Sequence, residues 1–530
     1  MKKNAIILAA GRSNRFAPFT YEKPKGLFRI KKQVLIERQI EQLLEAGVKE
    51  IYIVVGFMKE KFFYLEQKYK EVNLIINNTY GIHKGNLYSL FCSKEYLSNS
   101  YICCADHYFI INPFIEEEMN SYRAIEYRKE RFREFAVTVS NADVITSLKV
   151  GGEDSWIMAG HAYFDQEFSR VFVKLMEAEI NNFGIADMFW EEFYGSHQKE
   201  LTLYAKRYYN KEILEFESVE DLKNFDQDFL MNIDSFIVSN ICSILKCDPN
   251  DILNIEVIQK GLTNVNFKFM VNNIYYVYRH PGGTSANLVN RETEVWAQEK
   301  AKEIGIDRSV IYIDLAGWKL SYYIEDIIPC DFENTKHLKK VMNDLRVLHR
   351  INRKEWEGKI KVFDTYKEAM HLLNLASASK GDLNTEFSDL ISKVSKLNDY
   401  LTLDGFEKVW CHNDTYEPNF LITEKDEFYL IDWEYSGIND PAHDLGSILS
   451  RRNLSESEIK KILEEYFERE LTPKEYQHYT AYIVLSGFYW FCWGLYKGSV
   501  GDDDGFFFLP AYRNCIRLVD RALQSYERKN

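Results

Sequence analysis

Residues 410–435 read WCHNDTYEPNFLITEKDEFYLIDWEY, and the second half of the chain is organised around this stretch. The apolar runs at 420–422 and 428–431 predict two short strands, and the charged residues 424–427 predict the turn of a hairpin between them. Polar residues collect in the loop before the hairpin and again directly after it. The stretch therefore predicts two polar loops joined by a hairpin.

Two carboxylates and one amide in this stretch stand in the order that phosphoryl transfer requires. Asp414 and Asn419 are separated by four residues before the hairpin, and Asp432 follows its second strand. A kinase needs one carboxylate to receive the proton of the substrate hydroxyl. It also needs an amide oxygen and a second carboxylate to hold Mg²⁺ against the nucleotide phosphates. We therefore expect Asp414 to be catalytic and Asn419 and Asp432 to hold Mg²⁺.

The same stretch resembles the catalytic and metal-binding loops of the choline kinase and aminoglycoside phosphotransferase family. The order His412-Asn413-Asp414, with Asp-Trp-Glu-Tyr after the hairpin, favours the choline kinases. The resemblance implies an α+β protein-kinase-like domain, which we place at residues 231–530, with ATP as the phosphate donor. It also implies that Asp444 braces the catalytic loop.

The resemblance assigns further residues to this domain. Arg279 stands where protein kinases use a phosphate-contacting lysine, and a guanidinium suits a fixed bidentate phosphate contact. Glu294, at the start of the next predicted helix, is placed to pair with it. Asn264 lies in residues 260–267, which resemble the nucleotide loop of choline kinases. The expected aromatic choline pocket contains Tyr435, Trp493 and Tyr496.

A loop of small residues near the start of the chain has the character of a phosphate site. A strand predicted at residues 5–9 runs into Gly11, and Arg15 and Lys25 follow. Small residues after a strand let backbone N–H groups approach a phosphate closely, and basic side chains neutralise it. We interpret residues 5–9 as a buried strand rather than part of a secretory signal, because the apolar run is too short.

Strands and helices alternate after this loop. Helical patterns at residues 35–46 and 59–70 alternate with strand patterns at 51–55 and 74–76. Such alternation predicts a parallel, doubly wound α/β sheet, in which ligands bind at the carboxyl ends of the strands.

This half of the chain resembles nucleotidyltransferases, and among them bacterial phosphocholine cytidylyltransferases, through Leu8-Ala9-Ala10-Gly11 and the basic residues after it. The resemblance implies a Rossmann-like domain, which we place at residues 1–230, with CTP as co-substrate. Arg15 and Lys25 would neutralise the triphosphate, while Asp106 and Glu217 would hold Mg²⁺. The expected nucleotide-binding residues are Leu8, Ala9, Ala10, Gly11, Arg12, Ser13, Asn86 and Ser89.

Two positions depart from the family pattern. Ser13 stands where a second glycine is usual, and Glu217 stands where the family has a metal-binding Asp. The Glu keeps the charge but adds a methylene; a solvated residue at a helix start is the alternative interpretation.

Aromatic residues interleaved with acids lie between these motifs. Rings and carboxylates suit a quaternary ammonium group. Our candidates for its binding are Trp156, Trp190 and Glu191, with core packing as the alternative for each ring.

Composition limits the possible partners of this 530-residue chain. Its formal net charge of −14 has no basic run to offset it, which argues against nucleic acid or an anionic membrane as a partner. The nine cysteines are scattered without a Cys-x-x-Cys pair, so we expect neither a zinc site nor disulfides, and a cytoplasmic location. The uncharged residues 479–496 are barely long enough to span a bilayer, and we predict a buried helix there.

Together the two resemblances imply a bifunctional enzyme that phosphorylates choline with ATP and couples phosphocholine to CTP, releasing pyrophosphate. The same chemistry on ethanolamine or another amino alcohol is one alternative. An antibiotic phosphotransferase joined to a sugar nucleotidyltransferase is a second. A sensor or scaffold with a lapsed transferase site is a third, suggested by Ser13 and Glu217. The sequence does not indicate an oligomeric state.

Overall fold

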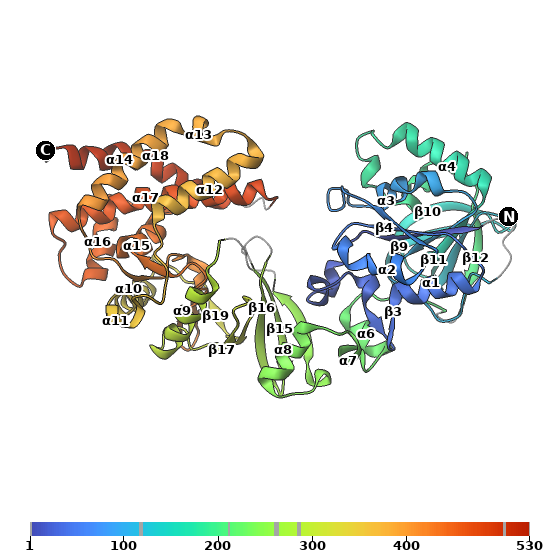
Figure 1. The fold of residues 1–530 in the computed structure, drawn as a ribbon, viewed down its shortest axis with the longest axis horizontal. Helices are drawn as coiled ribbons and strands as arrows, with labels where there is room; N and C mark the ends of the chain where they lie inside the picture. Colours follow the sequence, from blue (N-terminus) through green and yellow to red (C-terminus); the bar gives the residue numbers. More distant parts are fainter. Residues whose placement is uncertain are drawn as a thin grey trace. The chain divides into compact units, whose positions relative to one another are not determined.

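The computed structural model describes residues 3–115, 120–209, 212–258, 264–282, 288–501 and 505–528. The chain forms two compact units, residues 1–255 and 256–530 (Figure 1). Helix α8 (Phe236–Leu245), which lies within the range 231–530 that we expected for the second domain, belongs to the first unit.

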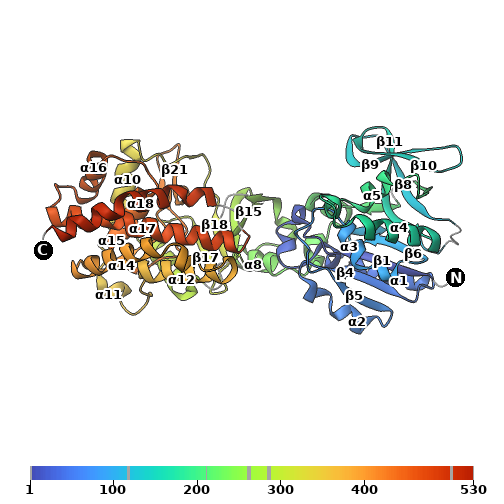
Figure 2. The same cartoon turned by 90° about the horizontal axis from the view of Figure 1, so that it is seen from above.

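The first unit contains a nine-stranded sheet in the order β10-β9-β11-β6-β1-β4-β5, in which β8 pairs with β11 and β12 pairs with β8. The strands β6, β1, β4 and β5 are parallel, as the alternation of strands and helices predicts. Beyond β6 the sheet continues through antiparallel pairs, and Figure 2 shows β9, β10 and β11 extending beyond the parallel strands. The sheet is therefore doubly wound in one half and mixed in the other. Its strands are β1 Asn4–Ala9, β4 Ile51–Val55, β5 Val72–Ile76, β6 Ser100–Cys104, β8 Tyr122–Arg128, β9 Phe132–Val139, β10 Ile145–Gly152, β11 Ser155–Phe164 and β12 Tyr204–Tyr208.

Helices cover both faces of the parallel strands, which explains the continuous apolar sequence of β1. Ile7 packs in one cluster with residues of α1 and α2, while Ile6 and Leu8 pack in another with residues of α3, α4 and α5. Successive side chains of a strand point to opposite faces, so a strand covered on both sides is apolar throughout. The helices of this unit besides α8 are α1 Leu35–Glu45, α2 Tyr64–Lys68, α3 Leu87–Cys92, α4 Gln166–Glu179, α5 Trp190–Ser196, α6 Val219–Phe225 and α7 Phe229–Asn232.

One predicted helix is broken. Residues 59–70 form a 3₁₀ turn at Lys59–Phe62 and then the short α2. Only Phe62 and Leu65 are buried there, so little apolar surface stabilises a longer helix.

Short strand pairs complete the unit: β2 Arg29–Ile30 with β3 Gln33–Val34, and β7 His107–Phe109 with β13 Ile213–Glu215.

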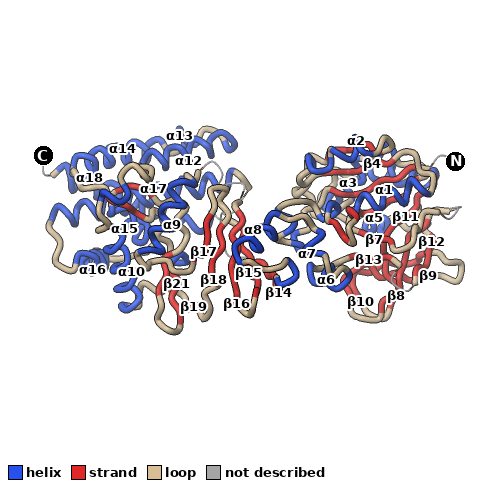
Figure 3. Tube along the Cα trace, turned by 60° about the horizontal axis from the view of Figure 1, so that its bottom comes forward, coloured by secondary structure: helices blue, strands red, loops and turns tan. Residues whose placement is uncertain are grey.

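The second unit has a five-stranded sheet in the order β14-β15-β16-β18-β17, followed by a mainly helical part (Figure 3). The predicted hairpin is present as β21 and β22, and β19 pairs with β21. A further pair, β20 with β23, brackets the catalytic stretch. The strands are β14 Leu253–Ile258, β15 Val265–Val271, β16 Ile274–His280, β17 Val310–Ile313, β18 Lys319–Tyr322, β19 Ile327–Ile328, β20 Val409–Cys411, β21 Phe420–Thr423, β22 Phe428–Leu430 and β23 Gly437–Asn439.

Helix α17 is the central helix of this unit. It packs against α12, α15 and α18, and most of its residues are buried, which is why residues 479–496 carry no charge. In the part of the chain that the structure describes, no helix is both long enough and apolar enough to cross a bilayer. The helices are α9 Arg291–Glu303, α10 Thr335–His349, α11 Arg353–Trp356, α12 Thr365–Lys380, α13 Leu383–Glu386, α14 Ser388–Leu403, α15 Pro441–Ser450, α16 Glu456–Phe467, α17 Pro473–Ser499 and α18 Gly505–Glu527.

Candidate active sites

The first candidate site lies where the strand order of the first unit reverses. From β1 the chain passes to β4 and β5 on one side and later to β6 on the other, so the carboxyl ends of β1 and β6 meet at a switch point. A cavity of about 340 Å³ opens there. The residues predicted from the sequence that line it are Leu8, Ala9, Ala10, Gly11, Arg12, Ser13, Lys25, Asn86, Ser89 and Asp106.

In the loop after β1, Ser13 occupies the position where the family usually has a second glycine. Ser13 has a backbone φ of 50°, in the left-handed region that favours glycine. The serine therefore keeps the loop conformation at some conformational cost.

Asn86 accepts a hydrogen bond from the backbone N–H of Trp190 (2.9 Å), so its side chain connects α5 to the cavity wall.

Lys25 and Asp106 form the charged centre of this cavity. The Lys25 Nζ lies 3.2 Å from Asp106 Oδ2 and donates to the carbonyl of Phe216 (2.8 Å). Burial alone raises the pKa of Asp106, but Lys25 and then His107 reverse this and hold the pKa at about 2. The carboxylate is thus ionised at neutral pH, as a ligand for Mg²⁺ must be.

Arg15 and Glu217 lie outside the residues that line the cavity. Their side chains are solvent-exposed and form an ion pair with each other. Glu217 directly follows Phe216, whose carbonyl binds Lys25, so the pair is connected to the charged centre through the backbone.

The three residues expected to bind a quaternary ammonium do not line the cavity either. Trp190 is 2% exposed and packs against Phe164 in the core. Glu191 pairs with Arg123 at 3.2 Å, and Trp156 packs against Tyr127. The aromatic residues that do line the cavity are Phe62, Tyr80, His83 and Phe189. Phe189 directly precedes Trp190, so the aromatic run that the sequence singles out reaches the cavity through Phe189.

The second candidate site is the catalytic stretch of the second unit. Asn419 Nδ2 donates to Asp414 Oδ2 and to the Asp414 carbonyl, both at 2.9 Å. This leaves the Asn419 carbonyl oxygen as the atom available to a cation, and the Asp432 carboxylate follows the hairpin directly. These donors fit the oxygen ligands that Mg²⁺ prefers. Burial, followed by the nearby Asp432, raises the pKa of Asp414 to about 7.

Buried side chains hold the catalytic loop in place. Asp444 accepts the backbone N–H of His412 (2.9 Å) and of Asn413 (2.7 Å), and it also receives His349 Nε2 at 2.9 Å. His412 Nε2 lies 3.0 Å from the carbonyl of Ile431, which links the loop to the hairpin. Asp444 therefore braces the loop, as the resemblance implies.

Arg279 lies in a buried cluster of opposite charges. It forms an ion pair with Glu294, as predicted, and its Nη1 lies 3.5 Å from Asp432 Oδ1. Asn264 Nδ2 donates to Glu434 Oε2 at 2.8 Å. Residues 260–263 of the predicted nucleotide loop lie outside the described residues.

A second cavity of about 80 Å³ lies beside the catalytic stretch. Tyr435 and Trp493 both line it, and Trp493 Nε1 donates to Tyr435 Oη at 3.2 Å. Tyr496 is not among the lining residues. Those that sequence reasoning missed include two rings, Phe363 and Tyr489, and two carboxylates, Glu368 and Glu434.

Comparison with known proteins gives a separate match for each unit. Residues 5–145 match the MobA-like NTP transferase domain, and residues 255–483 match the choline/ethanolamine kinase family. The choline-phosphate cytidylyltransferase of Streptococcus pneumoniae is 32% identical over 223 residues, 42% of this chain and 96% of the relative. The 2-aminoethylphosphonate cytidylyltransferase of Lancefieldella rimae is 31% identical over 233 residues, 43% of this chain and 94% of the relative. The crystal structure of choline kinase LicA from Streptococcus pneumoniae shares 26% identity, covering 54% of this chain and 98% of that chain with a TM-score of 0.46.

Proposed function

The chain belongs to the MobA-like NTP transferase domains over residues 5–145 and to the choline/ethanolamine kinases over residues 255–483, and we propose that it makes CDP-choline in two consecutive steps. The second unit transfers a phosphoryl group from ATP to the hydroxyl of choline. The first unit condenses the resulting phosphocholine with CTP and releases pyrophosphate. The phosphorylated amino alcohol that the second unit makes is the substrate that the first unit uses, so one amino alcohol connects the two halves.

In the kinase step, Asp414 orients the choline hydroxyl toward the γ-phosphate and receives its proton. Its orientation is fixed by Asn419 Nδ2. Asn419 Oδ1 and the Asp432 carboxylate would hold Mg²⁺, which when bound neutralises charge on the phosphates. Arg279, fixed by Glu294, is positioned near Asp432 to contact the same phosphates.

In the transferase step, a phosphocholine oxygen attacks the α-phosphorus of CTP, and the bond from that phosphorus to the pyrophosphate oxygen breaks. The buried Lys25 neutralises charge that develops on the phosphates, and the backbone of the loop after β1 supports them. Asp106, held ionised by Lys25, would be the cavity's ligand for Mg²⁺, with Glu217 as the second carboxylate. Neither step requires a covalent enzyme intermediate.

The aromatic cavity beside Asp432 is the observation that supports choline as the substrate. Tyr435, Tyr489 and Trp493 present rings to it, and Glu434 adds a carboxylate. Ring faces and a nearby negative charge replace the water around a trimethylammonium group at little cost, because that group has no N–H donors to satisfy.

Product analysis tests this proposal. Purified protein with choline, ATP, CTP and Mg²⁺ should yield CDP-choline and pyrophosphate. The same mixture without CTP should accumulate phosphocholine. The absence of phosphocholine, in a preparation that phosphorylates another alcohol, would refute the choline assignment.

A primary amine is the second candidate for the substrate. Glu368 and Glu434 give the kinase cavity two carboxylates that can accept N–H bonds, and one relative of the first unit is named for 2-aminoethylphosphonate. Values of kcat/KM for choline against ethanolamine, and for phosphocholine against 2-aminoethylphosphonate, distinguish the two. A sensor with a lapsed transferase site would instead bind CTP without releasing pyrophosphate.

A further inference from the structure

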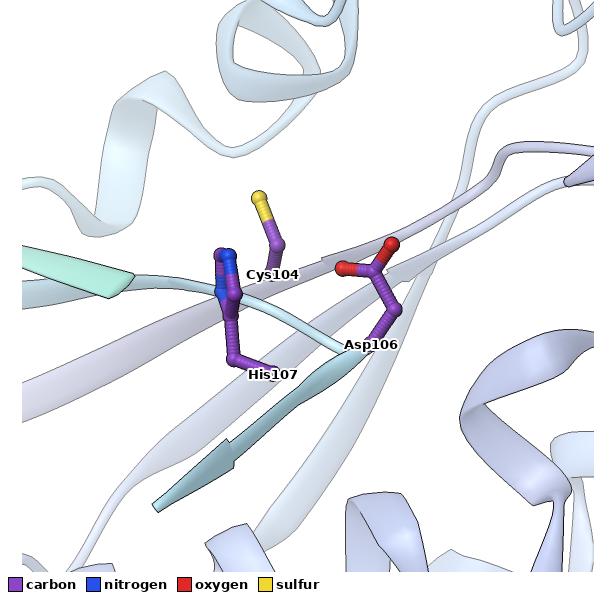
Figure 4. A group of neighbouring side chains, drawn as sticks. All are labelled: Cys104, Asp106 and His107. Atoms are coloured by element: carbon purple, nitrogen blue, oxygen red, sulfur yellow. The ribbon is translucent and has the colours of Figure 1, made fainter. Parts of the chain in front are cut away.

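Three different potential metal ligands meet at the turn between β6 and β7. The ligand atoms of Cys104, Asp106 and His107 all lie within 4.8 Å of one another. Figure 4 shows the three side chains extending to the same side of this turn. Thiol, carboxylate and imidazole together form a donor set typical of Zn²⁺ rather than of Mg²⁺.

His107 has the environment of a metal-binding histidine. It is 4% exposed, and its Nε2 lies 3.3 Å from Glu215 Oε2. Among the residues that the structure describes, its buried Nδ1 has no hydrogen-bond partner. Histidines that bind metals usually donate their other N–H to a carboxylate, which fixes the ring and leaves one lone pair for the ion. Glu215 supplies that carboxylate, and a buried nitrogen without a partner is otherwise costly.

The site is also accessible and balanced in charge. Cys104 and Asp106 both line the cavity of the first unit, so a dissolved ion can reach them. Lys25 Nζ contacts Asp106 at Oδ2, 3.2 Å away. Glu215 offsets the charge of Lys25, so one thiolate and one carboxylate would neutralise a divalent cation, and three protein ligands leave a fourth tetrahedral position for water or a phosphate oxygen.

A second group of similar composition shows the contrast. His349, Cys411 and Asp444 also cluster among the described residues. There His349 contacts Tyr466 Oη (2.8 Å) through Nδ1 and Asp444 (2.9 Å) through Nε2, and Asp444 accepts two backbone N–H groups. In that cluster the histidine and the carboxylate already have hydrogen-bond partners, whereas no described residue is a partner of His107 Nδ1.

We propose that Cys104, Asp106 and His107 form a binding site for a thiophilic divalent cation of the Zn²⁺ type, and that its occupation inhibits the transferase. Asp106 is the carboxylate that the proposed transferase reaction needs for Mg²⁺, so the two ions compete for it. The inhibitory consequence rests on the proposed function, whereas cation binding does not. The kinase uses other ligands and should be unaffected.

Cobalt binding to the full chain tests the site itself, because Co²⁺ bound by a thiolate gives a charge-transfer absorption in the near ultraviolet. Cys242 and Cys247 have sulfurs 4.0 Å apart and could bind cobalt themselves, so both are replaced by Ser in the background protein. We expect the band in this protein and after Cys92→Ser, the matched thiol control. Cys104→Ser should abolish it, and Glu215→Gln should weaken binding by about 10- to 100-fold. No band, or one that survives Cys104→Ser, would overturn the site.

The inhibitory role is tested separately on the same protein. Zn²⁺ added in the presence of excess Mg²⁺ should reduce CDP-choline formation from supplied phosphocholine and leave choline phosphorylation unchanged. A chelator that binds Zn²⁺ but not Mg²⁺ should reverse the effect. Inhibition equally strong after Cys104→Ser would overturn the competition for Asp106. If no cytidylyl transfer is detectable at all, the proposed function has failed, while the cobalt measurement still judges the site.

Discussion

Replacing Trp493 should weaken the use of choline far more than the use of ethanolamine. Its indole is 2% exposed, lines the kinase cavity and donates to Tyr435 Oη. A desolvated ring over a quaternary ammonium contributes about 1–2 kcal/mol. Trp493→Ala should therefore raise the KM for choline by about 5- to 30-fold, with a smaller change in kcat because Asp414 is untouched.

Two further variants separate the ring from its hydrogen bond. Trp493→Phe keeps an aromatic face and loses only the donor to Tyr435, which is worth about 1 kcal/mol, so KM should rise by about fivefold or less. Trp356→Phe is the matched control, because Trp356 is buried and donates through Nε1 to Ile351, yet does not line the cavity. Its KM should not change.

Steady-state kinetics with both alcohols, alongside the Kd for ATP, provide the assay. An unchanged Kd for ATP shows that the kinase unit is still folded. The ratio of kcat/KM values for choline over ethanolamine should fall in Trp493→Ala, because a primary ammonium depends more on N–H hydrogen bonds than on ring faces. Equal losses for both alcohols, or no loss for either, with ATP binding intact, would refute this assignment of Trp493.

Three other predictions concern groups with different roles. Asp414→Asn should reduce choline phosphorylation by about 10²- to 10⁴-fold, and supplied phosphocholine should restore CDP-choline formation; loss of both activities in folded protein would contradict two separate sites. Glu217→Ala should reduce cytidylyl transfer by at least about tenfold while Glu217→Asp retains much of it, and unchanged synthesis in the alanine variant would exclude Glu217 as a ligand. Burial lowers the pKa of His443 to about 4, below the unfolded pKa near 6.5. The neutral ring's contribution to the free energy of unfolding is therefore fully present above pH 6.5. It is lost as the pH falls toward 4. Urea unfolding measures this effect in the unmodified chain and in His443→Gln. Between pH 6.5 and pH 4 the free energy of unfolding should fall by about 3 kcal/mol less in His443→Gln than in the unmodified chain. Equal falls in the two proteins would count against this role of His443.

The hairpin of the catalytic stretch and the loop after β1 could be predicted because each depends on local sequence. Asp414, Asn419 and Asp432 lie within one loop–hairpin–loop stretch, and the hairpin between them is present as β21 and β22. The loop after β1 likewise follows a strand whose apolar sequence predicts burial on both faces. Residues separated by only a few positions can be arranged in few ways, so their order in the sequence largely predicts their arrangement in space.

The kinase cavity required information that spacing does not contain. Phe363 and Glu368 come from a segment far from the catalytic stretch in sequence, and they meet Tyr489 only because α12 packs against α17. Tyr496 follows Trp493 by three residues, so the two side chains lie on roughly the same face of α17. It nevertheless lies nearly one helical turn beyond Trp493, and it is not among the residues that line the cavity.

The aromatic run near residue 190 shows how a helical pattern can correct a motif. Trp190, Phe193 and Tyr194 have the spacing of one buried helix face, and all three pack in the core. Phe189 is the N-cap residue that precedes α5, outside this repeat, and it is the ring of this run that lines the cavity. Residue type alone suggests a cation site at Trp190, because an acid follows the tryptophan. The periodicity of its neighbours assigns Trp190 to the core and leaves the residue before the helix free to meet a ligand.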